Sequence, residues 1–183
     1  MNYICHSGGC DGADMEWENK GKQYGVKTIS YSFWNHKQSG ENQKILTVDE
    51  LKEGFEHVII ASKTIKRNPN HPYQYVKNLL SRNWYQVKNA ESIFAIGKFL
   101  NKSMVAGGTG WAVQMAIDNE KPVFFFDQES NVWNKYIHEI KEFKPLQVMS
   151  ILTENFAGIG TRELNKYGIN AIKDIYRDNF KII

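Results

Sequence analysis

Cysteine is scarce in this sequence, which contains only Cys5 and Cys10. Two cysteines are too few for a disulfide framework, and the five histidines are scattered without the spacing of metal ligands. Cys5 and Cys10 together with His6 could suggest a metal, but two thiols on opposite sides of a glycine turn are more often unpaired structural residues. We therefore predict neither a metal nor a cofactor.

Long apolar runs and blocks of like charge are also missing. An apolar run such as 123–126 has the length of a strand, not of a membrane helix. The 23 basic and 20 acidic residues are interspersed and leave a net charge of +3. Such a balance argues against nucleic acid and against a membrane surface as partners. With no recognisable signal peptide, the sequence predicts a soluble, cytoplasmic protein.

What is present is an alternation of short apolar runs with longer amphipathic ones. This alternation is typical of βα units around a mostly parallel sheet. The 183 residues, 42% of them hydrophobic, have the size and composition of one globular domain. We therefore predict a single domain over residues 1–183, of α/β class, with a Rossmann-like three-layer fold. Weaker periodicity predicts a β-hairpin within residues 132–148.

The expected elements follow from apolar spacing and capping signals. Strands are expected at residues 3–5, 26–31, 92–96 and 122–127, with one more leading into 156–162. Helices are expected at about 13–24, 47–64, 72–88, 111–119 and 163–180. The second of these helices opens with a capping box in which Thr47 and Glu50 are the paired residues. The polar segment 33–44 is expected to be a loop and is a candidate lid.

Three glycine-rich turns each separate a strand from a helix. Their sequences are SGGCDGAD at 7–14, AGGTG at 106–110 and AGIGTR at 157–162. Glycine lets the backbone approach a ligand, and a helix N-terminus offers unpaired N–H groups and a positive dipole end, which suit phosphate. In a parallel sheet such loops lie at the carboxyl ends of the strands, so we expect all three to meet at one pocket. None is a P-loop, because no Gly-Lys-Ser/Thr follows.

Most candidate ligand-binding residues belong to these loops. They are Ser7, Gly8, Gly9, Asp11, Asp14, Gly107, Gly108, Thr109, Gly110, Gly158, Gly160 and Arg162. Asp11 and Asp14 can accept hydrogen bonds from ribose hydroxyls, or can instead cap the helix that follows. Arg162 can donate two hydrogen bonds to phosphate, with a surface salt bridge as the alternative.

Further candidates lie outside the loops. Arg82, Asn83 and Gln86 belong to an expected helix, where a structural polar network is as compatible with the pattern as a binding site. Trp34 in the polar loop can stack on a base or close the edge of the core.

Together these segments resemble the SLOG superfamily, which includes the cytokinin-activating LOG enzymes, the DNA-processing protein DprA and proteins named as molybdenum cofactor carriers. Residues 7–14 resemble the motif SGGAxGAD, 82–86 resemble RNxxQ, 106–112 resemble GGTGxA and 156–162 resemble YAGIGSR. The motifs RNxxQ, GGTGxA and YAGIGSR are features of phage and bacterial members. The resemblance covers most of the chain and implies a Rossmann-like fold that binds a nucleotide-derived ligand.

The order of these motifs departs from the family, in which the AGIGSR strand leads into SGGAxGAD. Here the corresponding unit, 156–162, comes last, so the resemblance implies a circular permutant. We accordingly expect the strand before Gly158 to lie beside the strand at Tyr3 in a parallel sheet.

A second departure concerns catalysis. The resemblance would place a catalytic glutamate just after the second glycine loop, but residues 111–114 end in Gln114 and contain no acid. An amide cannot exchange protons as a carboxylic acid does, so binding without catalysis is favoured and no catalytic residue is assigned. Cys10 is not predicted to be a nucleophile, since the sequence places no base beside it.

Three functions remain to be compared. The favoured one is sequestration or sensing of a nucleotide second messenger, of the cyclic nucleotide or cyclic ADP-ribose type, with a phage counter-defence role by analogy. The alternative is a hydrolase acting on an N-glycosidic or phosphate bond through Asp11, Asp14 or Glu16. The third is binding of single-stranded DNA, which the balanced charge disfavours. The sequence leaves the oligomeric state open, a homo-oligomer included.

Overall fold

The computed structural model describes residues 2–148 and 151–180. Its strands are β1 (Ile4–Ser7), β2 (Lys27–Ser32), β3 (Gln43–Ile45), β4 (Ser92–Gly97), β5 (Phe99–Asn101), β6 (Met104–Val105), β7 (Val123–Asp127), β8 (Val132–Ile137), β9 (Glu142–Pro145) and β10 (Asn155–Gly160). Its helices are α1 (Ala13–Gln23), α2 (Val48–Ile65), α3 (Gln74–Lys88), α4 (Thr109–Asp118) and α5 (Lys166–Asn179).

One large sheet organises the chain, with strand order β3-β2-β1-β10-β4-β7-β8-β9. Neighbours from β3 through β7 run parallel, and β8 and β9 continue the sheet as an antiparallel hairpin. The predicted α/β class, the mostly parallel sheet and the hairpin within 132–148 are therefore confirmed. A second small hairpin, β5-β6, was not expected from the sequence.

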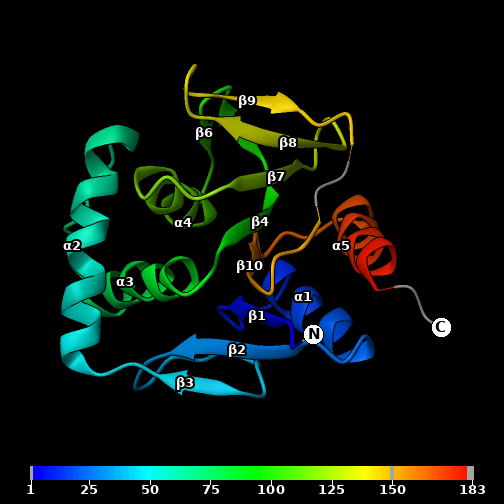
Figure 1. Ribbon diagram of the computed structural model, residues 1–183. Helices are drawn as coiled ribbons and strands as arrows, with labels where there is room; N and C mark the ends of the chain where they lie inside the picture. The colour runs from blue at the N-terminus through cyan, green and yellow to red at the C-terminus, as the bar shows by residue number, and fades with distance from the viewer. Residues whose placement is uncertain (1, 149–150, 181–183) are drawn as a thin grey trace.

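Helices cover both faces of this sheet (Figure 1). α1 and α5 pack together on one face, while α3 and α4 lie on the other, with α2 outside them. Alternate residues of the buried strands β4 and β7 supply the two cores. Ile93 and Phe125 face the α3–α4 side, and Phe94 and Phe124 face the α1–α5 side. Because both faces are covered, these strands carry apolar residues at nearly every position, as central parallel strands do.

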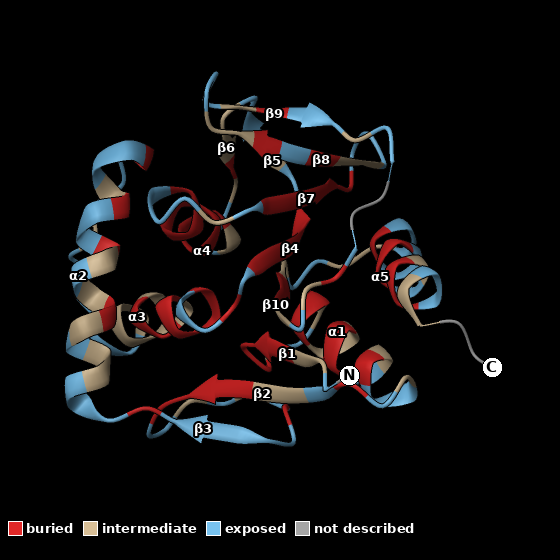
Figure 2. Ribbon diagram, in the orientation of Figure 1, coloured by how far each residue is buried: buried red, intermediate tan, exposed pale blue. Residues whose placement is uncertain are grey.

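Burial decreases from the middle of the sheet towards its edges (Figure 2). Every residue of β4 and β7 is buried, whereas every residue of β3 is exposed. Within residues 2–148 and 151–180, no helix is both long and apolar enough to cross a bilayer.

The strands that come first and last in the sequence, β1 and β10, are neighbours in the interior of the sheet. β1 pairs with β10 in parallel, with Ile4 opposite Asn155 and Cys5 opposite Phe156. This is the pairing expected from the motif order. The two ends of the described chain also meet, since the ring centroids of Tyr3 and Phe180 are 4.7 Å apart.

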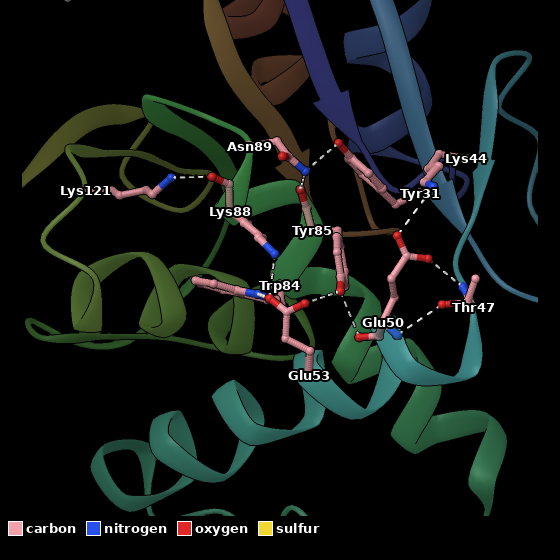
Figure 3. Close-up of polar contacts among 10 residues, drawn as sticks. All are labelled: Tyr31, Lys44, Thr47, Glu50, Glu53, Trp84, Tyr85, Lys88, Asn89 and Lys121. Carbon is pink, nitrogen blue, oxygen red and sulfur yellow. Dashed lines mark hydrogen bonds and ion pairs between the residues drawn. The ribbon is translucent and has the colours of Figure 1, made fainter.

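Helix α3 is held against α2 by a set of polar contacts on its outer side (Figure 3). Glu53 of α2 accepts hydrogen bonds from Trp84 Nε1 at 3.2 Å, from the Tyr85 hydroxyl at 2.8 Å and from Lys88 Nζ at 2.6 Å. The hydrogen bond from Lys88 is the main reason that the pKa of Glu53 falls to about 2. These contacts fix the helix that carries RNxxQ.

The N-terminus of α2 and the C-terminus of α3 are both capped by side chains. The predicted capping box is confirmed: Glu50 N donates to Thr47 Oγ1 at 3.2 Å, and Thr47 N donates to Glu50 Oε2 at 2.7 Å. At the end of α3, Lys121 Nζ donates to the carbonyls of Val87 at 2.6 Å and Lys88 at 2.9 Å. A cation at this position satisfies carbonyls that lack helical partners.

Candidate functional site

A pocket of about 860 Å³ opens at the carboxyl ends of β1, β10 and β4, which are neighbours in the sheet. All three glycine loops contribute to its lining: Cys10 and Asp14 from the first, 106–109 from the second and 159–163 from the third. RNxxQ of α3 contributes Arg82, Asn83 and Gln86. Segments far apart in the sequence thus meet where parallel strands end.

Asp14 joins the first loop to the third. Its Oδ1 accepts a hydrogen bond from Gly160 N at 3.0 Å, and close by Ala13 N donates to Thr161 O at 2.9 Å. Burial raises the pKa of Asp14 to about 6, against the opposing effect of the Arg82 charge. Gly12 is the N-cap of α1, so Asp14 does not cap this helix; it links two loops beneath the pocket.

Arg82 is the buried cation of the pocket, with only 4% of its surface exposed. Its Nη1 lies 3.9 Å from Asp14 Oδ2, and its Nη2 donates to Cys10 Sγ at 3.3 Å. Nε is buried and has no hydrogen-bond partner among the described residues. A Cβ at Gly8 would collide with Nη1, so only glycine leaves room for the guanidinium here.

The rest of RNxxQ secures the first glycine loop. In the amide orientation that satisfies its neighbours, Gln86 accepts from Gly8 N at 2.7 Å and from Arg82 Nη1 at 3.2 Å. It then donates to Asn83 Oδ1 at 3.2 Å. The structural network and the pocket lining, which the sequence left as alternatives, therefore involve the same side chains.

The second loop presents backbone to open space. Gly107 has a φ of 68°, which favours glycine, and a Cβ at Gly107 or Gly108 would meet no atom within 4 Å. Arg67 Nη1 donates to Gly107 O at 2.7 Å, and its guanidinium lies 5.3 Å from the centroid of the Trp111 ring. Arg67 was missed in the sequence, because nothing in its local pattern links the end of α2 to a loop 40 residues later.

Positive charge predominates in the pocket. Its basic residues are Arg67, Arg82, Lys98 and Arg162, and its acidic residues are Asp14 and Glu163. Arg162 is exposed at the rim and makes no hydrogen bond or ion pair within 2–148 and 151–180. The N-termini of α1 and α4 begin at the same loops and add positive dipole ends. This arrangement suits an anion.

Several predicted residues stand behind the lining. Ser7 is buried, and its Oγ accepts from Gly9 N at 3.3 Å, so these two shape the first loop from within. Gly158 and Gly110 also lie outside the lining, and together with Gly160 of the lining they allow close packing. A Cβ there would collide with Trp17, with Val105 O and with Ile96 O, respectively.

Two predicted residues point elsewhere. Trp34 is 82% exposed and lies outside the pocket lining, so it closes no edge of the core and stands over no ligand space. Asp11 is exposed and accepts a hydrogen bond from Ser39 Oγ at 3.1 Å, which ties the first glycine loop to the polar loop 33–42. Asp11 is not the cap of α1, because that position is Gly12.

Gln114 is turned away from the pocket. It is buried within α4, where its Nε2 donates to Asp118 Oδ1 at 2.8 Å. Of the three acids considered for hydrolysis, Asp11, Asp14 and Glu16, the pocket lining includes Asp14 alone. No group of three or more His, Cys, Asp or Glu side chains suited to a metal ion occurs in the described part of the chain.

A second groove, of about 580 Å³, lies between β2, β3 and α3 (Figure 3). Its lining residues are Lys27, Ile29, Tyr31, Asn42, Gln43, Lys44, Glu50, Tyr85, Lys88 and Asn89. Many of its polar groups are paired with one another: Lys44 Nζ lies 3.4 Å from Glu50 Oε1, and Asn89 Nδ2 donates to the Tyr31 hydroxyl at 2.9 Å.

The fold and the pocket define a Rossmann-like α/β protein with a site suited to anions. No protein-family model matches the sequence, and neither does any curated protein. A solved structure similar to this chain is described as a "putative molybdenum carrier protein" from Syntrophus aciditrophicus SB. It is 12% identical, with a TM-score of 0.49, and the match covers 98% of this chain and 95% of that one.

Proposed function

We propose that the protein binds a nucleotide-derived, phosphate-bearing small molecule in this pocket and holds it without converting it. The observation that carries the proposal is the convergence of three glycine loops on one space, together with Arg82 and Arg162. Backbone N–H groups at helix N-termini and forked guanidinium groups are the usual partners of phosphate. The volume of about 860 Å³ lies within the range of small-molecule sites.

Apolar residues of the pocket lining suit the rest of such a molecule. Val76, Leu79 and Leu80 of α3 supply apolar surface, and Ala112 adds to it from α4. A base or sugar face would lie against these side chains while its phosphates meet the glycine loops. The ligand class that we propose is a nucleotide second messenger, either cyclic or of the cyclic ADP-ribose type. Sequestration or sensing is the corresponding role, and counter-defence in a phage is an extension by analogy.

A second candidate function is hydrolysis of an N-glycosidic or phosphate bond, and it rests on Asp14. A carboxyl group whose pKa is raised to about 6 can donate a proton near neutral pH. Its Oδ1 is already engaged by Gly160 N, however, and no second acid lines the pocket except Glu163. These contacts favour a structural role for Asp14 and binding without turnover.

We also infer that the chain is a circularly permuted member of the SLOG superfamily. If numbering begins at β10, the parallel strands β1 and β2 follow in order on one side of β10, and β4 and β7 follow in order on its other side. With the short edge strand β3 left out, that is the 3-2-1-4-5 order of doubly wound folds. The contact between Tyr3 and Phe180 supports the inference that these two parts of the chain were joined in the unpermuted protein. A rearranged chain that begins before β10, with the present ends connected, should fold and bind the same ligand.

The direct test is calorimetry with a panel of linear and cyclic nucleotides, cyclic ADP-ribose compounds and a single-stranded DNA oligonucleotide. Released ligand is then identified by mass after heating. We expect one small nucleotide to bind and to return intact. Multiple turnover would replace the proposal with the hydrolase, and preference for the oligonucleotide would replace it with DNA binding.

Within that test, Arg162→Ala should weaken binding by about tenfold to a hundredfold, because it removes a charge-assisted hydrogen bond. Gln114→Ala is the matched control, since Gln114 faces Asp118 and not the pocket. Binding by Arg162→Ala as tight as wild type would contradict the phosphate assignment of the third loop.

A further inference from the structure

The two cysteines occupy opposite environments. Cys5 lies on β1 and is completely buried, and burial raises the pKa of its thiol far above the ordinary value. Cys10 is half-buried in the first glycine loop and lines the pocket. A completely buried thiol such as that of Cys5 is inert, whereas a partly exposed thiol in electropositive surroundings can be reactive.

The surroundings of Cys10 Sγ are polar and include a buried cation. Arg82 Nη2 donates to it at 3.3 Å, and His36 Nε2 lies at 3.8 Å. Helix α1 begins at Ala13, so its positive end is close by. A guanidinium and a helix N-terminus are groups commonly found beside reactive cysteines.

His36 is placed to donate to this sulfur. Burial first, and then the charges of Arg82 and Arg162, lower the pKa of His36 to about 4, so the ring is neutral at neutral pH. Ser32 Oγ lies 3.1 Å from Nδ1, and stacking on Phe33, at 4.7 Å between ring centroids, fixes the plane of the ring. When Ser32 donates to Nδ1, the ring proton is on Nε2 and points at Cys10 Sγ.

Arg82, which contacts Cys10, also has a hydrogen-bond donor left unsatisfied among the described residues. Arg82 is 4% exposed and lines the pocket, yet its buried Nε has no hydrogen-bond partner among the described residues. A buried N–H of a charged group without a partner is costly and commonly marks a place that a ligand or water completes. The sulfur and this unsatisfied donor belong to the same wall of the pocket.

We propose that Cys10 is a nucleophilic thiol and a modification site that reacts with small disulfides by thiol–disulfide exchange. Its proton passes to water, and the thiolate, held by Arg82 and His36, attacks one sulfur of the disulfide. A bond forms between Cys10 Sγ and that sulfur while the disulfide bond breaks. The second sulfur leaves as a thiolate with the bonding electron pair, so Cys10 is oxidised and the leaving group is reduced.

The mixed disulfide would stand in front of Arg82 and close the pocket to an anion. This consequence rests on the proposed function, whereas the reactivity of Cys10 does not. Modification would then release the bound nucleotide, and a bound nucleotide would protect Cys10.

The test treats the native protein, without nucleotide, with an aromatic disulfide that releases a coloured thiolate. One thiolate per chain should appear from the native protein, and a second only after unfolding, when Cys5 becomes accessible. Cys10→Ser should abolish the native phase, and peptide mapping of the wild type should locate the adduct on Cys10. Absence of any native phase, or an adduct on Cys5, would overturn the inference.

The contribution of His36 is tested by His36→Phe, which keeps the stacking on Phe33 but removes the Nε2 donor. We expect the native phase to slow about tenfold, as for loss of a hydrogen bond to a charged group. His57→Phe is the matched control, because His57 stacks on Trp84 at 3.4 Å between centroids and does not contact Cys10. An unchanged rate in His36→Phe would overturn the role given to His36.

The two proposals fail separately. A protein that binds a nucleotide but releases no native thiolate contradicts the Cys10 inference alone. A protein that reacts at Cys10 but binds nothing in the nucleotide panel contradicts the proposed function alone.

Discussion

The pocket and the second groove are built from similar residue types but differ in how those residues are bonded. In the second groove, Lys44 pairs with Glu50 and Asn89 donates to Tyr31, so charge and hydrogen-bonding capacity are largely satisfied within the protein. In the pocket, Arg162 has no ion pair among the described residues, and Arg82 Nε has no hydrogen-bond partner there. Unsatisfied donors, rather than basic residues as such, distinguish a binding site from a structural network.

One carboxyl group in each region has a shifted pKa, and the two shifts are in opposite directions. Burial dominates at Asp14 and raises its pKa to about 6, whereas hydrogen bonding from Lys88 dominates at Glu53, beside the second groove, and lowers its pKa to about 2. Burial therefore disfavours the charged form of Asp14 in the folded protein, whereas hydrogen bonds stabilise the charged form of Glu53. Folding around an anion site can include this cost of burial because bound ligand stabilises the folded state.

The largest effect should follow from Arg82→Met, which preserves much of the side-chain volume and removes the buried charge. We expect the affinity for the nucleotide to fall about a hundredfold, since charged hydrogen bonds contribute about 1.5–3 kcal/mol each. Calorimetry measures this, with circular dichroism to check folding. Arg177→Met is the control, because Arg177 pairs with Asp174 and Asp178 on the surface of α5. Equal losses in both variants would contradict the distinction drawn for the pocket.

The next effect concerns Asp14 and pH. Its folded-state pKa is raised from 3.8 to about 6, so the folded state holds the proton more tightly than the unfolded state does. Its contribution to stability is thus complete below about pH 4 and is lost as the pH rises through about 6, a change of up to about 3 kcal/mol. Asp14→Asn should lack this component in urea unfolding measured from about pH 4 to about pH 7. Identical pH profiles for the two proteins would show that Asp14 is not the buried acid described.

A smaller effect should follow from Thr47→Ala, which breaks the capping box of α2. The free energy of unfolding should fall by about 1 kcal/mol, as for other lost N-caps. Urea unfolding measures the change. Nucleotide affinity should stay within about twofold of the wild type, because this helix end contacts the second groove and not the pocket. A tenfold loss of affinity would mean that the two regions are coupled.

The smallest effect is expected for Lys44→Ala in the second groove. Side chains of this ion pair are 52% and 27% exposed, so the pair contributes about 0–1 kcal/mol to stability. Nucleotide affinity should not change measurably in calorimetry, although a basic residue is removed. If Lys44→Ala binds more weakly than Arg162→Ala, the ligand site is the second groove.

Much of the fold was predictable from local sequence. The α/β class, the hairpin after β7 and the capping box at Thr47 all depend on apolar spacing or on contacts within four residues, so short segments contain the information. The β5-β6 hairpin was missed because its strands are only three and two residues long and carry no readable period. The candidate residues were predictable as a set, but their roles were not.

Individual roles depended on neighbours that the sequence could not supply. Trp34 was a candidate because of its type, but nothing local indicates that its loop turns it into solvent. Cys10 was set aside because the sequence places no base beside it, and the contact that the structure adds is His36, 26 residues further on and 3.8 Å away in space. The position of Asp14 near the start of a helix is typical of a cap or a ligand contact. Its actual partner, Gly160, is 146 residues away in the sequence, so no local pattern could indicate it.

By itself, the sequence determined the alternation of strands and helices, the glycine loops between them and the balance of charge, since each follows from residue types within a few positions. The motif order already placed β10 beside β1, but only the tertiary structure decided that β4 lies on the other side of β10, because strand order depends on which apolar faces pack best over the whole chain. The pairing of β1 with β10 brings the first and third loops together through Asp14 and Gly160. Burial by the surrounding sheet and helices then sets the protonation of Asp14 and the partners of Arg82, which no local pattern contains.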